Sequence, residues 1–350
     1  MSAFALSSNR VLRMLSTAAI CLSLLLIGGL SGCGGQDGPS TDGGGPGAAQ
    51  QDKLQIAVIP KGTSHPYWRA VHGGAAKAAE EMDLNIIWNG PPSERARQQQ
   101  IEIMQNFTAR GVDGIVLAPL DSTALVRPVQ TAVNRGIPVV IIDSGLETEA
   151  YSSFVSTDNY KGGTMGAEKL GELMDGEGRA LMMRYSPGSA STKNREQGFL
   201  DTIQEKYPDI ELVSTDQYAG VTREESIKTA QDLISNYPDV EGIFCPNESS
   251  TFGMMRVLQK RGKSKERIKF VGFDATEDLA NGLEKGLIDA LVAQHPFKMG
   301  YTGVEMVYRA IQGKEVPKRK ATPSVLVTPD NLEDPEIQQV VNPSIQKYLD

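Results

Sequence analysis

The chain has 350 residues, a formal net charge of −8, three cysteines and three histidines. An acidic chain without a run of basic residues is not expected to bind nucleic acid, because Lys and Arg supply the contacts to phosphate. So few cysteines predict neither a disulfide framework nor a cysteine-based metal site. The sequence also lacks a phosphate-binding loop motif, so we expect no cofactor and no metal.

The first 33 residues have the pattern of a lipoprotein signal peptide. Arg10 and Arg13 form a short basic region, residues 15–30 are apolar and uncharged, and small residues stand directly before Cys33. The short apolar stretch is typical of a secretory signal and not of a spanning helix. We expect cleavage after residue 32 and lipid on Cys33; an ordinary signal peptide with a chance cysteine is the alternative. Loss of the two arginines changes the net charge from −8 to −10.

Residues 33–52 are expected to form a lipidated, disordered tether. This segment consists mainly of Gly, Ser, Pro, Asp and Gln, and such a composition cannot bury a core. The body that follows, residues 53–350, is long enough for two lobes of ordinary domain size.

Short apolar strands and helical patterns alternate along the body. Strands are predicted at residues 54–59, 84–88, 114–117, 137–142, 154–157, 179–184, 211–215, 242–244, 269–272 and 290–293, with helices at 66–82, up to 107, at 122–135, from 159 onward and between the later strands. Several strands are apolar at consecutive positions, which indicates a parallel sheet covered by helices on both faces. The rhythm restarts near residue 154, so we expect an α/β fold of two doubly wound parallel-sheet lobes.

Polar residues end four of these strands, and ligands bind beyond the carboxyl ends of strands in open parallel sheets. The residues are Asp143, Asn247, Asp274 and Gln294. Their oxygens can accept hydrogen bonds from sugar hydroxyls, and the amides can also donate. Each has another reading, because Asn247 and Asp274 suit helix N-caps and Asp143 suits a turn. Their joint occurrence at matching strand ends favours a binding site.

Two further segments supply candidate ligand contacts. Tyr67 and Trp68 follow the first strand at a helix start, and an aromatic ring can cover the C–H face of a sugar; a packing staple is the alternative. Residues 188–199 open a later helix, in which Lys193 or Arg195 could point at the ligand. The alternative there is a solvated Lys193 and an Arg195 in a structural ion pair.

At these residues the chain resembles the ribose-type periplasmic sugar-binding proteins, whose type I fold is shared with lactose-repressor effector domains. The resemblance runs from about residue 54 to 327. The matching segments are Ile-Pro-Val-Val-Ile-Ile-Asp ending at Asp143, Ser-Thr-Asp-Asn ending at Asn159, Arg-Glu-Gln-Gly-Phe ending at Phe199, Tyr-Pro-Asp-Val ending at Val240, Asn247, Val-Gly-Phe-Asp ending at Asp274, and Ala-Gln ending at Gln294.

The resemblance implies a monomer of two lobes that close on a ligand by hinge motion. Three crossovers would lie near residues 157–158, after Gln294 and near residues 324–325. The N-terminal lobe would comprise residues 53–157 and 295–324, and the C-terminal lobe residues 158–294 and 325–350.

The resemblance also implies the ligand contacts. The stacking aromatic falls on Trp68, with Tyr67 beside it. The polar contacts fall on Lys61, His65, Asp143, Lys193, Asn247, Asp274 and Gln294, with Arg195 next to the set.

Four of these positions depart from the family's ribose binders. Ser144 and Lys193 stand where Arg is usual, Lys61 where a small hydroxyl is usual, and His65 where Asn is usual. The second-lobe aromatic is not clearly placed, since Tyr218 and Val221 both align with it. We therefore do not expect ribose itself. The two lysines and the histidine could suit a sugar with a carboxylate or phosphate, although Asp143 and Asp274 would oppose a strongly anionic one.

The expected function is a lipid-anchored binding protein on the periplasmic side of the cell envelope that delivers a sugar-like solute to an ABC permease. The alternative is a ligand-binding input to a membrane chemoreceptor or sensor kinase. A transcriptional repressor would need a helix-turn-helix where the signal and tether stand. An enzyme is not expected, because His-Glu-x-x-His and Gly-x-Ser-x-Gly are absent and a glycosidase pair of Asp143 and Asp274 would span two mobile lobes. A Ca²⁺-binding loop pattern is also absent.

Overall fold

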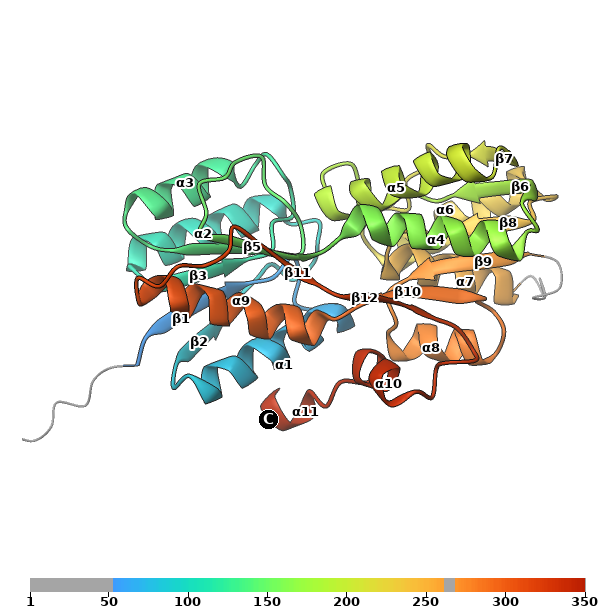
Figure 1. Cartoon of the computed structure of the whole chain (residues 1–350). Helices are drawn as coiled ribbons and strands as arrows, with labels where there is room; N and C mark the ends of the chain where they lie inside the picture. The colour runs from blue at the N-terminus through green and yellow to red at the C-terminus, as the bar shows by residue number, and fades with distance from the viewer. Residues whose placement is uncertain (1–52, 261–267, 350) are drawn as a thin grey trace, which may run out of the picture. The chain divides into compact units, whose positions relative to one another are not determined.

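Two six-stranded sheets organise the part of the chain that the computed structural model describes, residues 53–260 and 268–349 (Figure 1). The predicted signal peptide, the lipidated Cys33 and the tether up to residue 52 lie outside the described residues. None of the helices in the described ranges combines the length and apolarity needed to cross a membrane.

The first sheet has the strand order β11-β5-β4-β3-β1-β2, with all neighbours parallel. Its strands are β1 (Gln55–Ile59), β2 (Asn85–Trp88), β3 (Gly114–Leu117), β4 (Val139–Ile142), β5 (Ser153–Thr157) and β11 (Arg319–Thr322). One face packs on helices α1 (Pro66–Glu81) and α9 (Pro296–Ile311), and the other on α2 (Arg97–Arg110) and α3 (Val126–Asn134). We call this sheet and its helices the first lobe.

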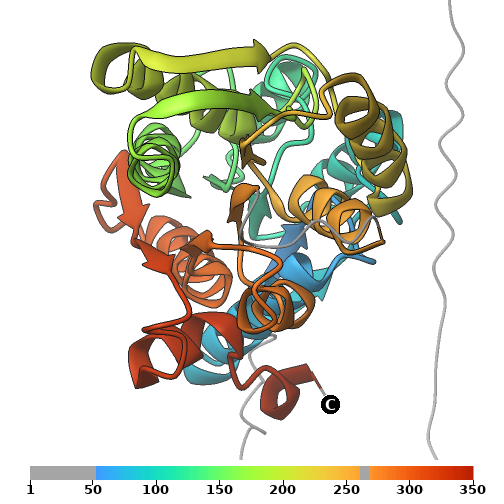
Figure 2. The ribbon, with the colours of Figure 1, turned by 90° about the vertical axis from the view of Figure 1, so that its right-hand side faces the viewer.

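The second sheet has the order β12-β10-β9-β8-β6-β7, with only β12 antiparallel to its neighbour. Its strands are β6 (Glu177–Met182), β7 (Asp209–Ser214), β8 (Gly242–Phe244), β9 (Lys269–Phe273), β10 (Ala290–Gln294) and β12 (Ser324–Val327). Its helices are α4 (Asn159–Leu173) and α5 (Ala190–Lys206) on one face, and α6 (Arg223–Asn236), α7 (Glu248–Lys260), α8 (Glu277–Glu284) and α10 (Pro335–Val341) on the other. Figure 2 shows helices on both sides of this sheet. We call this the second lobe.

The predicted fold class, two doubly wound parallel-sheet lobes, is confirmed by this topology. The two sheet orders correspond strand for strand, so that β4 in the first lobe has the place of β9 in the second. Consecutive apolar residues predicted these strands correctly. Strands such as β3 and β4 are buried at every position, as expected for a sheet covered on both faces.

The same glycine device packs a pair of helices in each lobe. Gly74 of α1 and Gly300 of α9 face each other in the first lobe, and Gly163 of α4 and Gly198 of α5 do so in the second. A Cβ at any of the four would lie 1.8 to 2.1 Å from a backbone carbonyl oxygen of the opposing helix. Only glycine therefore permits these close crossings, which fix the starts of α1 and α5 beside the strand ends.

Three connections join the lobes, as predicted. The chain passes from β5 to α4, from β10 to α9 and from β11 to β12. Side chains at the ends of the three strands meet there: Thr157 Oγ1 donates to Gln294 Oε1 at 2.9 Å and lies 3.4 Å from Thr322 Oγ1. The crossing strands thus form one hydrogen-bonded hinge.

The predicted strands begin and end within two residues of the observed ones, and some other predicted boundaries differ more. Helix α3 begins at Val126, not at residue 122, because the Asp121 carboxylate accepts from the backbone N–H groups of Thr123 and Ala124 and forms a turn there. The last helix, α11 (Gln346–Leu349), contacts α1 of the first lobe, whereas the sequence placed residues 325–350 in the C-terminal lobe.

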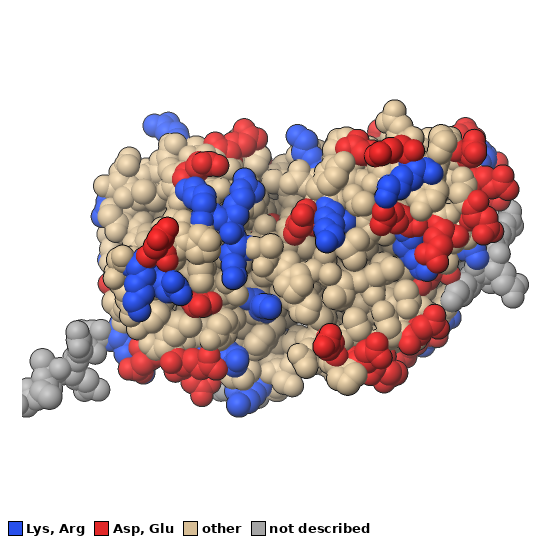
Figure 3. Space-filling view, viewed as in Figure 1, with Lys and Arg blue, Asp and Glu red and all other residues tan. Residues whose placement is uncertain are grey.

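Charged side chains of both signs cover the face seen in Figure 3. Acidic groups predominate over the second lobe, and basic and acidic groups are interspersed over the first. The described residues on this face therefore present no broad basic surface of the kind that binds nucleic acid.

Candidate ligand-binding site

A small cavity, in which about 40 Å³ is open to the centre of a water molecule, lies between residues that follow strand ends in both lobes. Nine of the eleven predicted ligand-site residues line it: Lys61, His65, Tyr67, Trp68, Asp143, Arg195, Asn247, Asp274 and Gln294. The topological argument from strand ends therefore brings most of the expected side chains to one place.

Two predicted residues do not line the cavity. Ser144 is 1% exposed and lies behind it, where its hydroxyl accepts from Lys61 Nζ at 2.6 Å and donates to Ser191 Oγ at 2.8 Å. Lys193 is exposed on α5. Successive helical positions point about 100° apart, so Thr192 and Arg195 face the cavity while Lys193 faces solvent.

Six lining residues were not among the predicted contacts: Glu94, Tyr185, Ser189, Ser191, Thr192 and Glu248. The two serines and Thr192 belong to the start of α5, where only Lys193 and Arg195 are predicted contacts, and Glu248 follows Asn247 at a strand end. Glu94 and Tyr185 stand in loops without a motif, so nothing in the sequence pattern marks them.

Lys61 and Asp143 form a buried ion pair within the first lobe. Lys61 follows β1 and Asp143 follows β4, and Lys61 Nζ lies 2.6 Å from Asp143 Oδ2 with both side chains 5% exposed. Burial raises the pKa of Asp143, but the ammonium of Lys61 outweighs this effect and the pKa lies below its usual value. Lys61 is thus committed to a protein carboxylate.

Asp274 occupies the end of β9 in the second lobe. Its Oδ1 accepts from Gln294 Nε2 at 2.7 Å, and its Oδ2 accepts from the backbone N–H of Glu248 at 3.1 Å. Burial raises the pKa of Asp274 despite the opposing charge of Arg195. No Lys or Arg of the described residues forms an ion pair with it, which leaves its remaining lone pairs for ligand hydroxyls.

Aromatic side chains from both lobes line the cavity and share one carboxylate. Trp68 Nε1 donates to Glu94 Oε1 at 2.8 Å, and Tyr185 OH donates to Glu94 Oε2 at 2.6 Å. Tyr67 meets Trp68 edge to face and donates to Asp143 Oδ1 at 3.2 Å. Burial raises the pKa of Tyr185 well above its ordinary value, so this phenol remains a neutral donor.

Tyr185 is the aromatic side chain of the second lobe that lines the cavity. Tyr218, one of the two positions aligned with the family's second-lobe aromatic, is 43% exposed and lies under the Arg184 guanidinium. Val221, the other aligned position, lies in a loop, where its backbone N–H donates to Glu225 Oε2 at 2.9 Å. Neither side chain lines the cavity.

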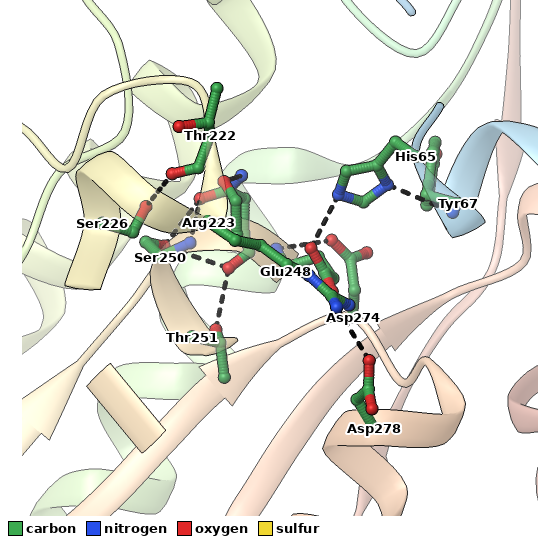
Figure 4. Close-up of polar contacts among 12 residues, drawn as sticks. His65, Tyr67, Thr222, Arg223, Ser226, Glu248, Ser250, Thr251, Asp274 and Asp278 are labelled. Atoms are coloured by element: carbon green, nitrogen blue, oxygen red, sulfur yellow. Dashed lines mark hydrogen bonds and ion pairs between the residues drawn. The ribbon is translucent and has the colours of Figure 1, made fainter. Parts of the chain in front are cut away.

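Glu248 links the two lobes through His65 (Figure 4). His65 Nε2 lies 2.7 Å from Glu248 Oε2, while Arg223 holds Glu248 Oε1 and also donates to Asp278 at 2.8 Å. Burial opposes the charge of Glu248, but His65 and Arg223 lower its pKa to about 2. Burial likewise lowers the pKa of His65, but Glu248 outweighs it and the pKa is raised.

Arg195 and Asn247 are each held by the protein. Arg195 is 2% exposed, donates to Asn159 Oδ1 at 2.8 Å and to the Pro246 carbonyl at 2.9 Å. Asn247 Oδ1 accepts from the backbone N–H of Ser250 at 3.4 Å, as an N-cap does, and from the Ser250 hydroxyl at 2.6 Å. Both residues therefore meet a ligand as fixed, preorganised groups.

Nothing among the described residues resembles a metal centre, since no three His, Cys, Asp or Glu side chains are grouped as ligands. Two doubly wound lobes on a three-strand hinge, with a polar and aromatic cavity at their strand ends, define a solute-binding protein of the type I class.

Comparison with known proteins gives the family. The family model described as "Periplasmic binding protein domain" matches residues 56–315, and the chain belongs to this family. It is 26% identical to the ribose import binding protein RbsB of Bacillus subtilis (strain 168), over 80% of this chain and 89% of that protein. It is 28% identical to the D-allose-binding periplasmic protein of Escherichia coli (strain K12), over 78% and 92%.

A solved carbohydrate transporter solute-binding protein from Agrobacterium radiobacter, in complex with D-arabinose, is also similar. It superposes with a TM-score of 0.81 at 31% identity and covers 83% of this chain and 100% of that one. The resemblance to ribose-type periplasmic binding proteins is thereby confirmed, and these relatives are transport proteins, not enzymes.

Proposed function

We propose that this protein captures a sugar or sugar-like polyol between its lobes and delivers it to the permease of an ABC importer. The cavity carries the proposal: Trp68 and Tyr185 supply aromatic rings, and Asp143 and Asp274 supply buried carboxylates from opposite lobes. Aromatic rings cover sugar C–H faces, and carboxylates accept strong hydrogen bonds from hydroxyls. Relatives named for ribose import and D-allose binding support a ligand of monosaccharide size.

The ligand would dock first on the first lobe, against Trp68 and Asp143. Rotation about the hinge then brings Asp274 and Gln294 onto the remaining hydroxyls. Binding shifts an open–closed equilibrium, because the closed form alone offers contacts from both lobes. The surface that the closed lobes share is what a permease would recognise.

The protein would act on the periplasmic side of the cell envelope, as a monomer held by lipid on Cys33. The signal pattern before Cys33 and the Gly-rich tether support this placement. Radiolabelled palmitate should enter the wild-type protein in cells and should not enter the Cys33→Ser variant. Equal labelling of the two would refute the anchor without touching the binding function.

Thermal-shift measurements on the purified protein in mild detergent test the binding function. A panel of pentoses, hexoses and polyols should contain at least one compound that raises the melting temperature. At about 100-fold excess over Kd, a ligand adds roughly 2.7 kcal/mol to the free energy of unfolding. A folded protein that responds to no sugar or polyol would overturn the proposal.

A further inference from the structure

The cavity has more acidic than basic side chains. Four carboxylates line it, those of Glu94, Asp143, Glu248 and Asp274. The lining basic side chains are Lys61, Arg195 and His65. With His65 protonated and Arg223 held against Glu248 from outside the cavity, the four carboxylates face four cations, so the cavity offers no excess of positive charge to an anionic ligand.

The basic groups that suggested an acidic sugar are already engaged. Lys61 pairs with Asp143 at 2.6 Å, and His65 pairs with Glu248 at 2.7 Å. Lys193 is exposed and does not line the cavity. A ligand carboxylate or phosphate would therefore have to compete with protein carboxylates for Lys61 and His65. Arg195 is the lining cation without a carboxylate partner among the described residues, and it already donates to Asn159 Oδ1 and to the Pro246 carbonyl.

Glu94 differs from the paired carboxylates. Asp143 has Lys61 and Glu248 has Arg223 within ion-pair distance, but no Lys, Arg or His of the described residues forms an ion pair with Glu94. Its two oxygens accept only from neutral donors, the indole of Trp68 and the phenol of Tyr185. These hydrogen bonds fix the position of the carboxylate without cancelling its charge.

The partners of Glu94 are the two aromatic side chains of the cavity. Trp68 and Tyr185 come from opposite lobes, and both rings line the same space as the carboxylate. An ammonium group is attracted by aromatic faces and forms charge-assisted hydrogen bonds with a carboxylate. A carboxylate that is fixed by two neutral donors and has lone pairs left in the same cavity is thus a receptor for a protonated amine.

We infer that this site prefers a sugar or polyol carrying a protonated amine, whose ammonium binds Glu94 between Trp68 and Tyr185. The inference rests on the proposed sugar-binding function and specifies its substrate class. The amine supplies the ion-pair partner that Glu94 lacks among the described residues, while the hydroxyls of the ligand meet Asp143 and Asp274.

Matched ligand triads test the inference by isothermal titration calorimetry at about pH 6, where the amines are protonated. The first triad is glucose, glucosamine and glucuronate, and the second is galactose, galactosamine and galacturonate. For at least one triad we expect the amine to bind about tenfold more tightly than the neutral sugar, a difference of about 1.4 kcal/mol. The acid should bind most weakly.

The variant Glu94→Gln keeps an acceptor for Trp68 and removes the charge. It should abolish the amine preference, so that the amine and the neutral sugar of a triad bind the variant with equal affinity. Glu225→Gln is the control, because Glu225 pairs with Arg95 across the lobes but does not line the cavity; this variant should keep the preference.

Three outcomes overturn the inference while the proposed function stands: neutral sugars that bind as tightly as their amines, acids that bind best, and an amine preference that survives Glu94→Gln. Failure of the proposed function looks different, because then no neutral sugar, amine or polyol binds the folded protein.

Discussion

Asp143 and Asp274 occupy equivalent positions in the two lobes. Asp143 follows β4 and Asp274 follows β9, which have the same place in the two sheet orders. Both residues adopt a left-handed backbone, with φ of 64° and 69°. Asp tolerates this conformation better than most residues, and it marks sites where structure is held for function. Each lobe therefore presents one strand-end aspartate to the cavity with the same local backbone geometry.

The two carboxylates should nevertheless respond differently to mutation. Asp143→Asn leaves the buried ammonium of Lys61 without its counter-ion, and we expect about 3 kcal/mol lower stability in urea unfolding. Asp274→Asn strands no cation, so it should lower ligand affinity by about tenfold with a much smaller effect on unfolding. Restoration of stability in the double variant Lys61→Met/Asp143→Asn would support the ion-pair argument. If Asp143→Asn and Asp274→Asn were equally stable, the ion-pair argument would be contradicted.

Trp68 should contribute through both its ring and its indole N–H. Trp68→Ala removes the aromatic surface and should weaken sugar binding by at least about 1.5 kcal/mol, roughly tenfold. Trp68→Phe keeps a ring but loses the bond to Glu94 at 2.8 Å, and should lie between wild type and Trp68→Ala. Trp88→Phe is a control, because Trp88 stacks on His72 away from the cavity. Titration calorimetry ranks the three variants, and unchanged affinity in Trp68→Ala would remove Trp68 from the site.

Strand-end residues could be predicted because the physics that places them is local in sequence. Buried strands appear as apolar runs, and parallel pairing brings their carboxyl ends to one edge. Asp143, Asn247, Asp274 and Gln294 follow from that rule alone. The fold class was predictable for the same reason, since the alternation of strands and helices specifies a doubly wound sheet.

The remaining site residues depend on tertiary geometry that no local pattern encodes. Glu94 and Tyr185 come together only because loops from opposite lobes meet over the cavity. Lys193 was misplaced because a motif does not reveal helix phase, and one residue changes the direction of a side chain by about 100°. Glu248 was passed over beside Asn247, although His65 and Arg223 both bind it.

Protein stability should be greatest in a mildly acidic window set by His65 and Glu248. The pKa of folded His65 is raised above 6.5, so its contribution is complete below pH 6.5 and is lost as the pH rises through the folded value. The pKa of Glu248 is lowered from 4.5 to about 2, so its contribution is complete above pH 4.5 and is lost as the pH falls toward 2. Both contributions are therefore complete between pH 4.5 and 6.5.

Urea unfolding at several pH values measures this window. Protonation of His65 should raise the free energy of unfolding by only about 1 kcal/mol. The protonated ring can no longer accept, at Nδ1, the hydrogen bond from the Tyr67 N–H. His65→Gln should flatten the stability profile above pH 6. His72→Gln should not flatten the profile. Burial lowers the pKa of His72, so His72 destabilises the protein at acidic pH, which is the opposite of the effect of His65. A profile that His65→Gln leaves unchanged would exclude the His65–Glu248 pair as the cause.

The C-terminal segment should restrain the hinge, because it leaves the second lobe and ends on the first. Ile337 of α10 is buried in the core of the second lobe. Farther on, Ile345 packs at Gly73, where a Cβ would lie 2.9 Å from its Cγ2, and the Tyr348 ring lies 5.8 Å from that of Phe297. Figure 1 shows α10 and α11 running from one lobe toward the other below the hinge.

Deletion of residues 344–350 should therefore favour the open form. Without ligand, small-angle X-ray scattering should give a larger radius of gyration. The affinity for the ligand should be two- to fivefold weaker, which corresponds to about 0.4 to 1 kcal/mol of binding free energy. The melting temperature should change little. Ile337→Ala is the matched control: it creates a cavity within one lobe and should cost about 2 kcal/mol or more of stability without altering closure. If the truncated protein keeps both the wild-type radius and the wild-type affinity, the segment does not restrain the hinge.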